Sequence, residues 1–119
     1  MSSVLLMYEK ILVPKIRTFL KSTYKTDEAE INFRMAEKII KESNPALIVV
    51  FAEELSSSEV LELQRIILLA KNSKLCIIAN ENECRQYQKS ITEGRVYCIK
   101  TPISDFRLLA EIQVTAMSI

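Results

Sequence analysis

An unbroken apolar run at residues 46–51, Ala-Leu-Ile-Val-Val-Phe, is the feature that most restricts the fold of this chain. A strand that faces solvent on one side alternates apolar and polar residues, whereas a strand covered on both faces is apolar throughout. Asn44 and Pro45 precede the run and end any helix before it, because the residue before a proline is disfavoured in the α region. We therefore expect residues 46–51 to form a central strand with helices on both sides of its sheet.

Strand-like runs alternate with amphipathic helical stretches along the whole chain. The other runs are at residues 4–8, 75–79 and 96–99. Apolar residues at helical spacing follow the runs: Ile16, Phe19 and Leu20, then Val60, Leu63, Ile67 and Ala70, and then Cys84, Tyr87 and Ile91. This alternation predicts an α/β fold with a doubly wound parallel sheet, (βα)5, in one domain over residues 1–119.

Residues 26–43 fit two structures. Residues 30–33 alternate like a short edge strand, although Ala29, Phe33, Ala36 and Ile40 also share one helical face. We expect a short strand followed by a helix through Ile40; a single long helix would remove one edge of the sheet. The predicted core consists of Leu5, Leu6, Phe19, Leu47, Val49, Leu63, Ile67, Ile77, Ile78, Ile99 and Leu109.

Several residues are typical of helix ends. Ser56 and Glu59 have the spacing of a capping box, in which each side chain binds the other residue's backbone N–H. Gly94 stands where a helix would end in a left-handed residue. Ser104 is expected to cap a last helix that turns Phe106, Leu109 and Ala110 inward.

The composition excludes several classes of function. The chain has no histidine and one glycine, so it lacks histidine-dependent catalysis, an imidazole metal site, a GxGxxG loop and a P-loop. A net charge of +1 argues against direct nucleic-acid binding, and no apolar run approaches the ~20 residues of a membrane-spanning helix. We expect no metal, no cofactor, no enzymatic activity and a cytoplasmic location.

The three cysteines favour the same location. Cys76 and Cys98 lie in apolar runs and are predicted to be reduced core residues, with a disulfide between neighbouring strands as the alternative. A zinc site built from cysteine alone needs a paired short spacing that the chain does not have.

Residues 45–50, 75–79 and 97–102 resemble the receiver domains of bacterial response regulators, and the resemblance extends over nearly the whole chain. The most specific match is Tyr97 three residues before Lys100, although Thr101 separates this lysine from Pro102. The resemblance implies the strand order 2-1-3-4-5 and a site at the carboxyl ends of the strands.

The same resemblance implies phosphoryl transfer to an aspartate, but the matching positions have largely lost that chemistry. Tyr8 and Glu9 stand for the acidic pair that holds Mg²⁺, Phe51 for the nucleophilic aspartate, and Ala79 for the hydroxyl residue; Lys100 alone matches fully. A benzyl group can neither attack phosphorus nor bind a metal. The resemblance therefore predicts the fold and contradicts the reaction, which leaves a receiver-like domain held in one conformation.

Two further interpretations concern charged residues near this edge. Glu53 or Glu54 could serve as a substitute acceptor, but both are expected to be solvated loop residues with the wrong reach for in-line transfer. Glu9 and Lys100 are expected to form a partly buried ion pair rather than the remnant of a metal and phosphate site.

Without the reaction, function is expected to depend on a surface. The resemblance points to the face of the fourth helix, fifth strand and fifth helix, where receivers bind effector domains or form homodimers. Here the candidates are Arg85, Tyr87, Tyr97, Arg107 and Glu111, although the tyrosines also suit ordinary half-buried positions. The alternatives are a flavodoxin-like small-molecule or cofactor binder, which lacks its phosphate loop here, and a structural subunit of a larger assembly.

Overall fold

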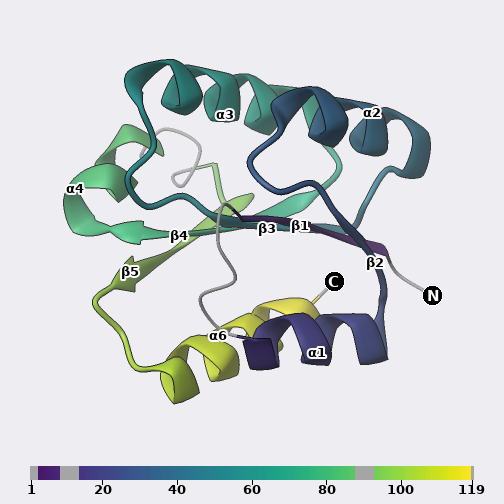
Figure 1. Ribbon diagram of the computed structural model, residues 1–119, viewed down its shortest axis with the longest axis vertical. Coiled ribbons are helices and arrows are strands. Elements are labelled where there is room, and N and C mark those ends of the chain that lie inside the picture. The colour runs from purple at the N-terminus through teal and green to yellow at the C-terminus, as the bar shows by residue number, and fades with distance from the viewer. Residues whose placement is uncertain (1–2, 9–13, 88–92, 119) are drawn as a thin grey trace.

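A parallel sheet with the strand order β2-β1-β3-β4-β5 forms the middle layer of the structure (Figure 1). It is seen in a computed structural model that describes residues 3–8, 14–87 and 93–118. The strands are β1 (Ser3–Met7), β2 (Lys25–Glu28), β3 (Leu47–Phe51), β4 (Lys74–Asn80) and β5 (Val96–Thr101). The predicted fold class and strand order are confirmed.

Helices cover both faces of this sheet (Figure 1). One face packs against α2 (Phe33–Ser43) and α3 (Ser57–Leu69), and the other against α1 (Pro14–Thr23) and α6 (Asp105–Met117). The short α4 (Glu81–Cys84) and the 3₁₀ turn η1 (Arg85–Tyr87) follow β4 at the side of the sheet.

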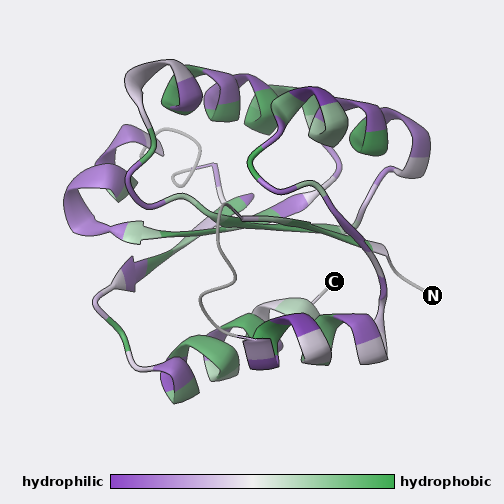
Figure 2. Cartoon of the chain, viewed as in Figure 1, coloured by the Kyte–Doolittle hydropathy of each residue, from purple (hydrophilic) through white to green (hydrophobic). Residues whose placement is uncertain are grey.

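The central strand β3 is buried along its whole length, as its apolar sequence predicts. Ile48 and Val50 face α2 and α3, whereas Leu47, Val49 and Phe51 face α1 and α6. Each apolar side chain that leaves water contributes roughly 1.5–3 kcal/mol, so both cores depend on this strand. In Figure 2 the central strands are mostly hydrophobic, whereas hydrophobic and hydrophilic residues alternate along the helices on both sides.

The caps predicted at Ser56 and Ser104 are present. Ser56 and Glu59 form a full capping box, and the Ser104 hydroxyl accepts a hydrogen bond from the backbone N–H of Arg107 at 3.3 Å. Gly94 has a φ of +81°, in the left-handed region that favours glycine, and lies in a turn before β5; the helix end predicted there involves residues 88–92, which lie outside the described residues. Of the predicted core residues, Phe19 and Leu109 are partly buried and the others are buried.

The prediction for residues 30–33 is wrong in position, although the edge strand exists. β2 is Lys25–Glu28, a polar segment that pairs with β1 alone and whose side chains stay partly exposed. Because an edge strand of this kind does not need apolar residues, the apolar pattern misplaced it. Ile31 and Phe33 instead pack against the core on the α2 side of the sheet.

The inward face of α6 also differs from the prediction. Leu108, Ile112 and Ala116, at helical i, i+4 and i+8 spacing, are buried, whereas Phe106 is 82% exposed. Leu109 and Ala110 are half-buried at the sides of the helix. The helix is therefore rotated relative to the prediction, and an apolar residue faces solvent.

The prediction of reduced core cysteines is wrong for Cys98, which forms a disulfide with Cys84 of α4. A bond between the neighbouring strands is excluded by register, because Cys76 pairs with Tyr97 and Cys98 pairs with Ile77. Residues next to each other on a strand point to opposite faces, so Cys76 and Cys98 cannot meet. Cys76 remains a free, buried thiol.

No helix in residues 3–8, 14–87 and 93–118 has the length and apolar character needed to cross a membrane.

Replacing Ser56 with alanine tests the capping box. Loss of the hydroxyl leaves the backbone N–H of Glu59 without its acceptor, so we expect the free energy of unfolding to fall by about 1 kcal/mol in urea denaturation. Ser57→Ala, one residue further into the helix, is the matched control and should change stability little. Equal losses in the two variants would contradict the role of the cap.

Candidate functional site

The carboxyl ends of the strands bring together four of the five positions matched to a phosphorylation site. Tyr8 directly follows β1, Phe51 ends β3, and Ala79 of β4 pairs with Lys100 of β5. Glu9 lies outside the described residues. The predicted positions therefore share one edge of the sheet, which is where ligands bind in open α/β folds.

Apolar side chains fill this edge at β3 and β4. Phe51 is 9% exposed, and Ala52, Ile78 and Ala79 are buried. Phe51 and Ile78 extend the core under α1 and α6, while Ala52 and Ala79 extend the opposite core. The positions one residue before or after Phe51 and Ala79 also carry neither a carboxylate nor a hydroxyl.

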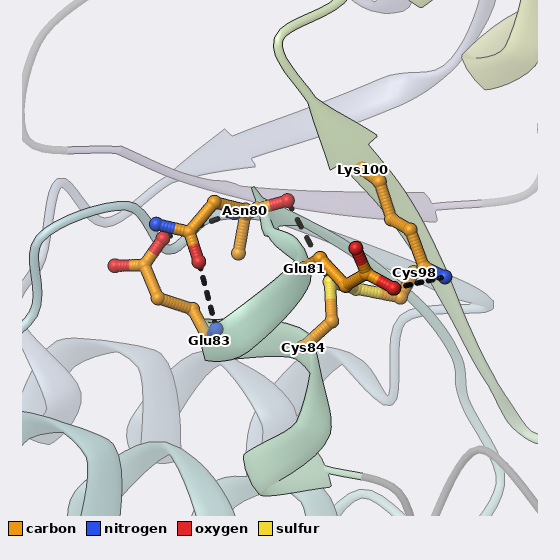
Figure 3. Close-up of a disulfide and its surroundings, with 7 residues drawn as sticks. Asn80, Glu81, Glu83, Cys84, Cys98 and Lys100 are labelled. Carbon is orange, nitrogen blue, oxygen red and sulfur yellow. Dashed lines mark hydrogen bonds and ion pairs between the residues drawn. A yellow bond between two sulfur atoms is a disulfide. The ribbon is translucent and has the colours of Figure 1, made fainter.

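The loop after β3 is bound by a carboxylate from α4. The backbone N–H of Glu54, a residue with a φ of +60°, donates a hydrogen bond to Glu83 Oε2 at 2.7 Å. The other oxygen of Glu83 accepts the backbone N–H of Asn80 at 3.0 Å, and the Asn80 side chain caps α4 in return (Figure 3). The Glu83 carboxylate thus accepts hydrogen bonds from backbone N–H groups that follow β3 and β4.

The predicted ion pair of Glu9 with Lys100 falls partly outside the described residues, because it includes Glu9. The Lys100 side chain is exposed, and its ammonium lies 3.9 Å from the carboxylate of Glu81, which is also exposed (Figure 3). Arg85 approaches the same carboxylate at 4.0 Å. Exposed pairs at these distances contribute little stability, because water screens them and long side chains lose entropy when they are held.

A cluster around Glu28, at the end of β2, was not predicted from the sequence. The Glu28 carboxylate accepts hydrogen bonds from the Tyr8 hydroxyl at 3.2 Å and from Arg17 at 3.0 Å, and it pairs with Lys21 at 2.9 Å. No sequence signal could have found it, because β2 was placed several residues too late. It borders a pocket of about 410 Å³ lined by Tyr8, Arg17, Glu28, Ala29, Glu30, Asn32 and Met35.

The charges in this cluster shift the pKa values of its members. Burial alone would raise the pKa of Glu28, but the hydrogen bonds from Lys21, Arg17 and Tyr8 together hold it below its usual range. Burial and the neighbouring Glu28 charge raise the pKa of Tyr8. Tyr8 therefore stays protonated and binds Glu28, and it offers no anionic oxygen for a metal.

Among the described residues, no group of three or more acidic or cysteine side chains could hold a metal ion. Glu53 is half-buried and Glu54 is exposed, and both lie in the loop after β3.

The predicted interaction face is only partly exposed. Tyr87 is 3% exposed, so it is a core residue and is wrong as a surface candidate; burial raises its pKa to about 12. Tyr97 is 42% exposed, Arg85 and Arg107 are exposed, and Glu111 is half-buried.

An apolar stripe on the outer side of α6 was not predicted from the sequence, because Phe106 and Ala110 were expected to face inward. The stripe consists of Phe106, Ala110, Val114 and Met117, which share one helix face. Beside it runs a groove of about 360 Å³ between α6 and the edge strand β5, lined by Tyr97, Cys98, Ile99, Ala110, Glu111, Val114 and Thr115.

Replacing Glu28 with glutamine tests the cluster at β2. A carboxyl whose pKa is lowered by folding stabilises the protein above its unfolded pKa, and this contribution is lost as the pH falls. We expect Glu28→Gln to lower the free energy of unfolding by about 1 kcal/mol near neutral pH, after allowance for the partly exposed cations, and to have almost no effect near pH 3 in urea denaturation. Glu42→Gln on the exposed side of α2 is the control; a loss for Glu28→Gln that does not vary with pH would contradict the electrostatic explanation.

Comparison with known proteins agrees with this geometry. No protein-family model and no curated protein sequence matches the chain. Among solved structures, the receiver domain of NtrC4 from Aquifex aeolicus is similar, with a TM-score of 0.66 at 24% identity over 95% of this chain and 94% of that one.

Two further solved structures have the same fold. A structure described as adenylate cyclase from Rhodopirellula baltica has a TM-score of 0.70 at 18% identity, over 95% of this chain and 85% of that one. The receiver domain of a LuxO repressor protein from Vibrio parahaemolyticus has a TM-score of 0.66 at 20% identity, over 95% of this chain and 88% of that one. The chain therefore has the fold of response regulator receiver domains.

Proposed function

We propose that this domain is a receiver-like protein-interaction module of signal transduction that works without phosphoryl transfer and is not an enzyme. The observation that carries the proposal is the apolar edge of the sheet, where Phe51, Ala52, Ile78 and Ala79 leave no phosphoryl acceptor. Buried apolar groups at this place also avoid the repulsion and desolvation of a cluster of acids. The protein therefore needs no metal or phosphate to be stable.

The working surface in this proposal is the α6 stripe together with the groove beside β5. Phe106, Val114 and Met117 are exposed large apolar residues on one helix, and Tyr97 borders them from the edge strand. Exposed apolar groups that form a continuous patch are typical of binding sites, whereas scattered ones are ordinary. Direct nucleic-acid binding is not part of the proposal, since the chain carries a net charge of only +1.

The occupant we propose for this surface is a second copy of the chain. A two-fold interface must be complementary to itself, and an antiparallel pair of α6 helices crossing at Ala110 satisfies this condition. The small Ala110 side chains allow close approach, and Phe106 of each helix then lies opposite Val114 of the other. Arg107 and Glu111, one turn apart, would form pairs of opposite charge across the axis.

Charge reversal tests this arrangement directly. We expect self-association of the full chain in sedimentation velocity, weakened by Arg107→Glu and by Glu111→Arg because each places like charges opposite each other. The double variant should restore it, since opposite charges face each other again.

Two matched substitutions complete the test. Val114 on the stripe is 68% exposed and Leu68 on α3 is 67% exposed, so Val114→Asp should abolish association while Leu68→Asp leaves it unchanged. A monomer at all concentrations, or equal effects of these two substitutions, would contradict the homodimer and direct the search to an effector domain as the partner.

Incubation with acetyl phosphate and Mg²⁺ tests the absence of phosphoryl transfer. We expect the intact mass to stay unchanged, because the strand ends hold no acceptor, while a receiver domain with its aspartate gains a phosphoryl group under the same conditions. A stoichiometric adduct would overturn this part of the proposal, and Glu53→Gln and Glu54→Gln would then identify the acceptor.

We also place this function in the cytoplasm, as the sequence predicts. A disulfide in that compartment is generally transient and regulatory, since cellular thiols keep most cysteines reduced. The Cys84–Cys98 bond is therefore relevant to how the surface is controlled.

A further inference from the structure

The disulfide joins the short helix α4 to the strand that borders the proposed docking groove. Cys84 is the last residue of α4 and is buried, while Cys98 lies in β5 and is half-buried (Figure 3). Their Cα atoms are 6.3 Å apart, within the range of natural disulfides. Cys98 also borders the groove beside α6, between Tyr97 and Ile99, but its side chain faces the opposite side of the sheet, so the disulfide meets the groove through the backbone of β5. The bond thus connects α4 with the surface assigned to binding.

The third cysteine is separated from this pair. Cys76 is fully buried in β4 and belongs to the core under α1 and α6, while Cys84 and Cys98 lie on the other side of the sheet. Burial raises the pKa of the Cys76 thiol to about 12, so it is a poor nucleophile. Exchange with Cys76 is therefore blocked by position and by reactivity, and the chemistry is confined to two residues.

The other links of α4 and η1 to the rest of the domain are non-covalent. Glu83 joins α4 to the β3 loop, while in η1 the carbonyl of Gln86 accepts a hydrogen bond from Gln64 at 3.0 Å and Tyr87 packs into the core. Between α4 and β5, the exposed pair of Glu81 and Lys100 at 3.9 Å is weak. The disulfide is therefore the strong connection between α4 and β5.

We propose that Cys84 and Cys98 form a reversible redox modification site that takes a protein or small-molecule dithiol as its reductant. A thiolate of the dithiol attacks Cys98 Sγ, the Cys84–Cys98 bond breaks, and Cys84 leaves as a thiolate that takes up a proton. The second thiol of the reductant then attacks the reductant's first sulfur, which is bonded to Cys98 in the mixed disulfide. This step releases the Cys98 thiolate, which is protonated in turn. Two electrons pass to the protein, and the dithiol becomes a disulfide.

Reduction controls binding at the same surface, so this inference rests in part on the proposed function. β5 is an edge strand with β4 as its neighbour in the sheet, and the disulfide restrains it on its α4 side. Release of this restraint allows the backbone at Tyr97 and Ile99 to adjust and removes the preformed shape of the groove. We expect the oxidised protein to self-associate and reduction to raise the dissociation constant at least about fivefold.

The experiment uses the full chain in three states: as oxidised by glutathione disulfide, after dithiothreitol, and after reoxidation. Alkylation of the native protein followed by intact mass should add two groups after reduction and neither of these two when oxidised. Amide spectra should shift at α4 and β5 on reduction and return on reoxidation, and sedimentation velocity should follow the same cycle. The double variant Cys84→Ser with Cys98→Ser should behave as the reduced protein after glutathione disulfide as well as after dithiothreitol, whereas Cys76→Ala should keep the full response.

The outcomes separate this inference from the proposed function. Cysteines that remain alkylatable after glutathione disulfide, or a bond that dithiothreitol cannot reduce in the native protein, would overturn the redox site. A reversible bond with unchanged self-association would overturn its control of the surface. A monomer in every state, with reversible shifts at α4 and β5, would overturn the homodimer and the control of it while the modification site stands.

Discussion

The burial of β3 on both faces is the constraint on which the rest of the structure depends. Every residue of Leu47–Phe51 is buried, and alternate side chains supply the two cores that hold α2 and α3 on one side and α1 and α6 on the other. In a parallel sheet covered by helices, a charged group on such a strand is tolerated only where a ligand or a partner satisfies it. Here the apolar pattern continues to the carboxyl end of the strand, at Phe51 and Ala52. The edge that would hold a ligand in an open α/β fold is therefore part of the core.

Around this apolar edge, the protein satisfies its own polar groups. Glu83 accepts hydrogen bonds from the backbone N–H groups of Glu54 and Asn80. Glu28 accepts a hydrogen bond from Tyr8 and pairs with the cations of α1. In both places an internal carboxylate is already bound by donors of the protein. Two other features are not satisfied in this way or not confined to the core. Apolar side chains remain exposed on α6, and a disulfide connects α4 to β5. In the function proposed above, a signal acts through changes at these surfaces and not through a phosphoryl group.

Much of the fold follows from local patterns, and the differences have physical reasons. The apolar run at β3 and the Ser56 cap were predictable, because burial on both faces and capping each have a direct sequence pattern. The edge strand β2 was misplaced, since Lys25–Glu28 pairs along one side and needs no apolar face. The site positions at the strand ends were found through the resemblance, but the Glu28 cluster and the α6 stripe depend on where β2 lies and on how α6 is rotated. Neither is encoded by a short motif.

The absence of a phosphoryl switch at the carboxyl edge of the sheet is the proposal on which this function depends. It is tested most directly by amide spectra of the protein recorded with Mg²⁺ and then with Mg²⁺ and beryllofluoride, a mimic of a phosphoryl group on a carboxylate. We expect unchanged resonances for Tyr8, Phe51, Ala79 and Lys100 in both additions, because these positions offer neither a metal site nor an acceptor. Saturable shifts at this edge that spread to β5 would contradict it.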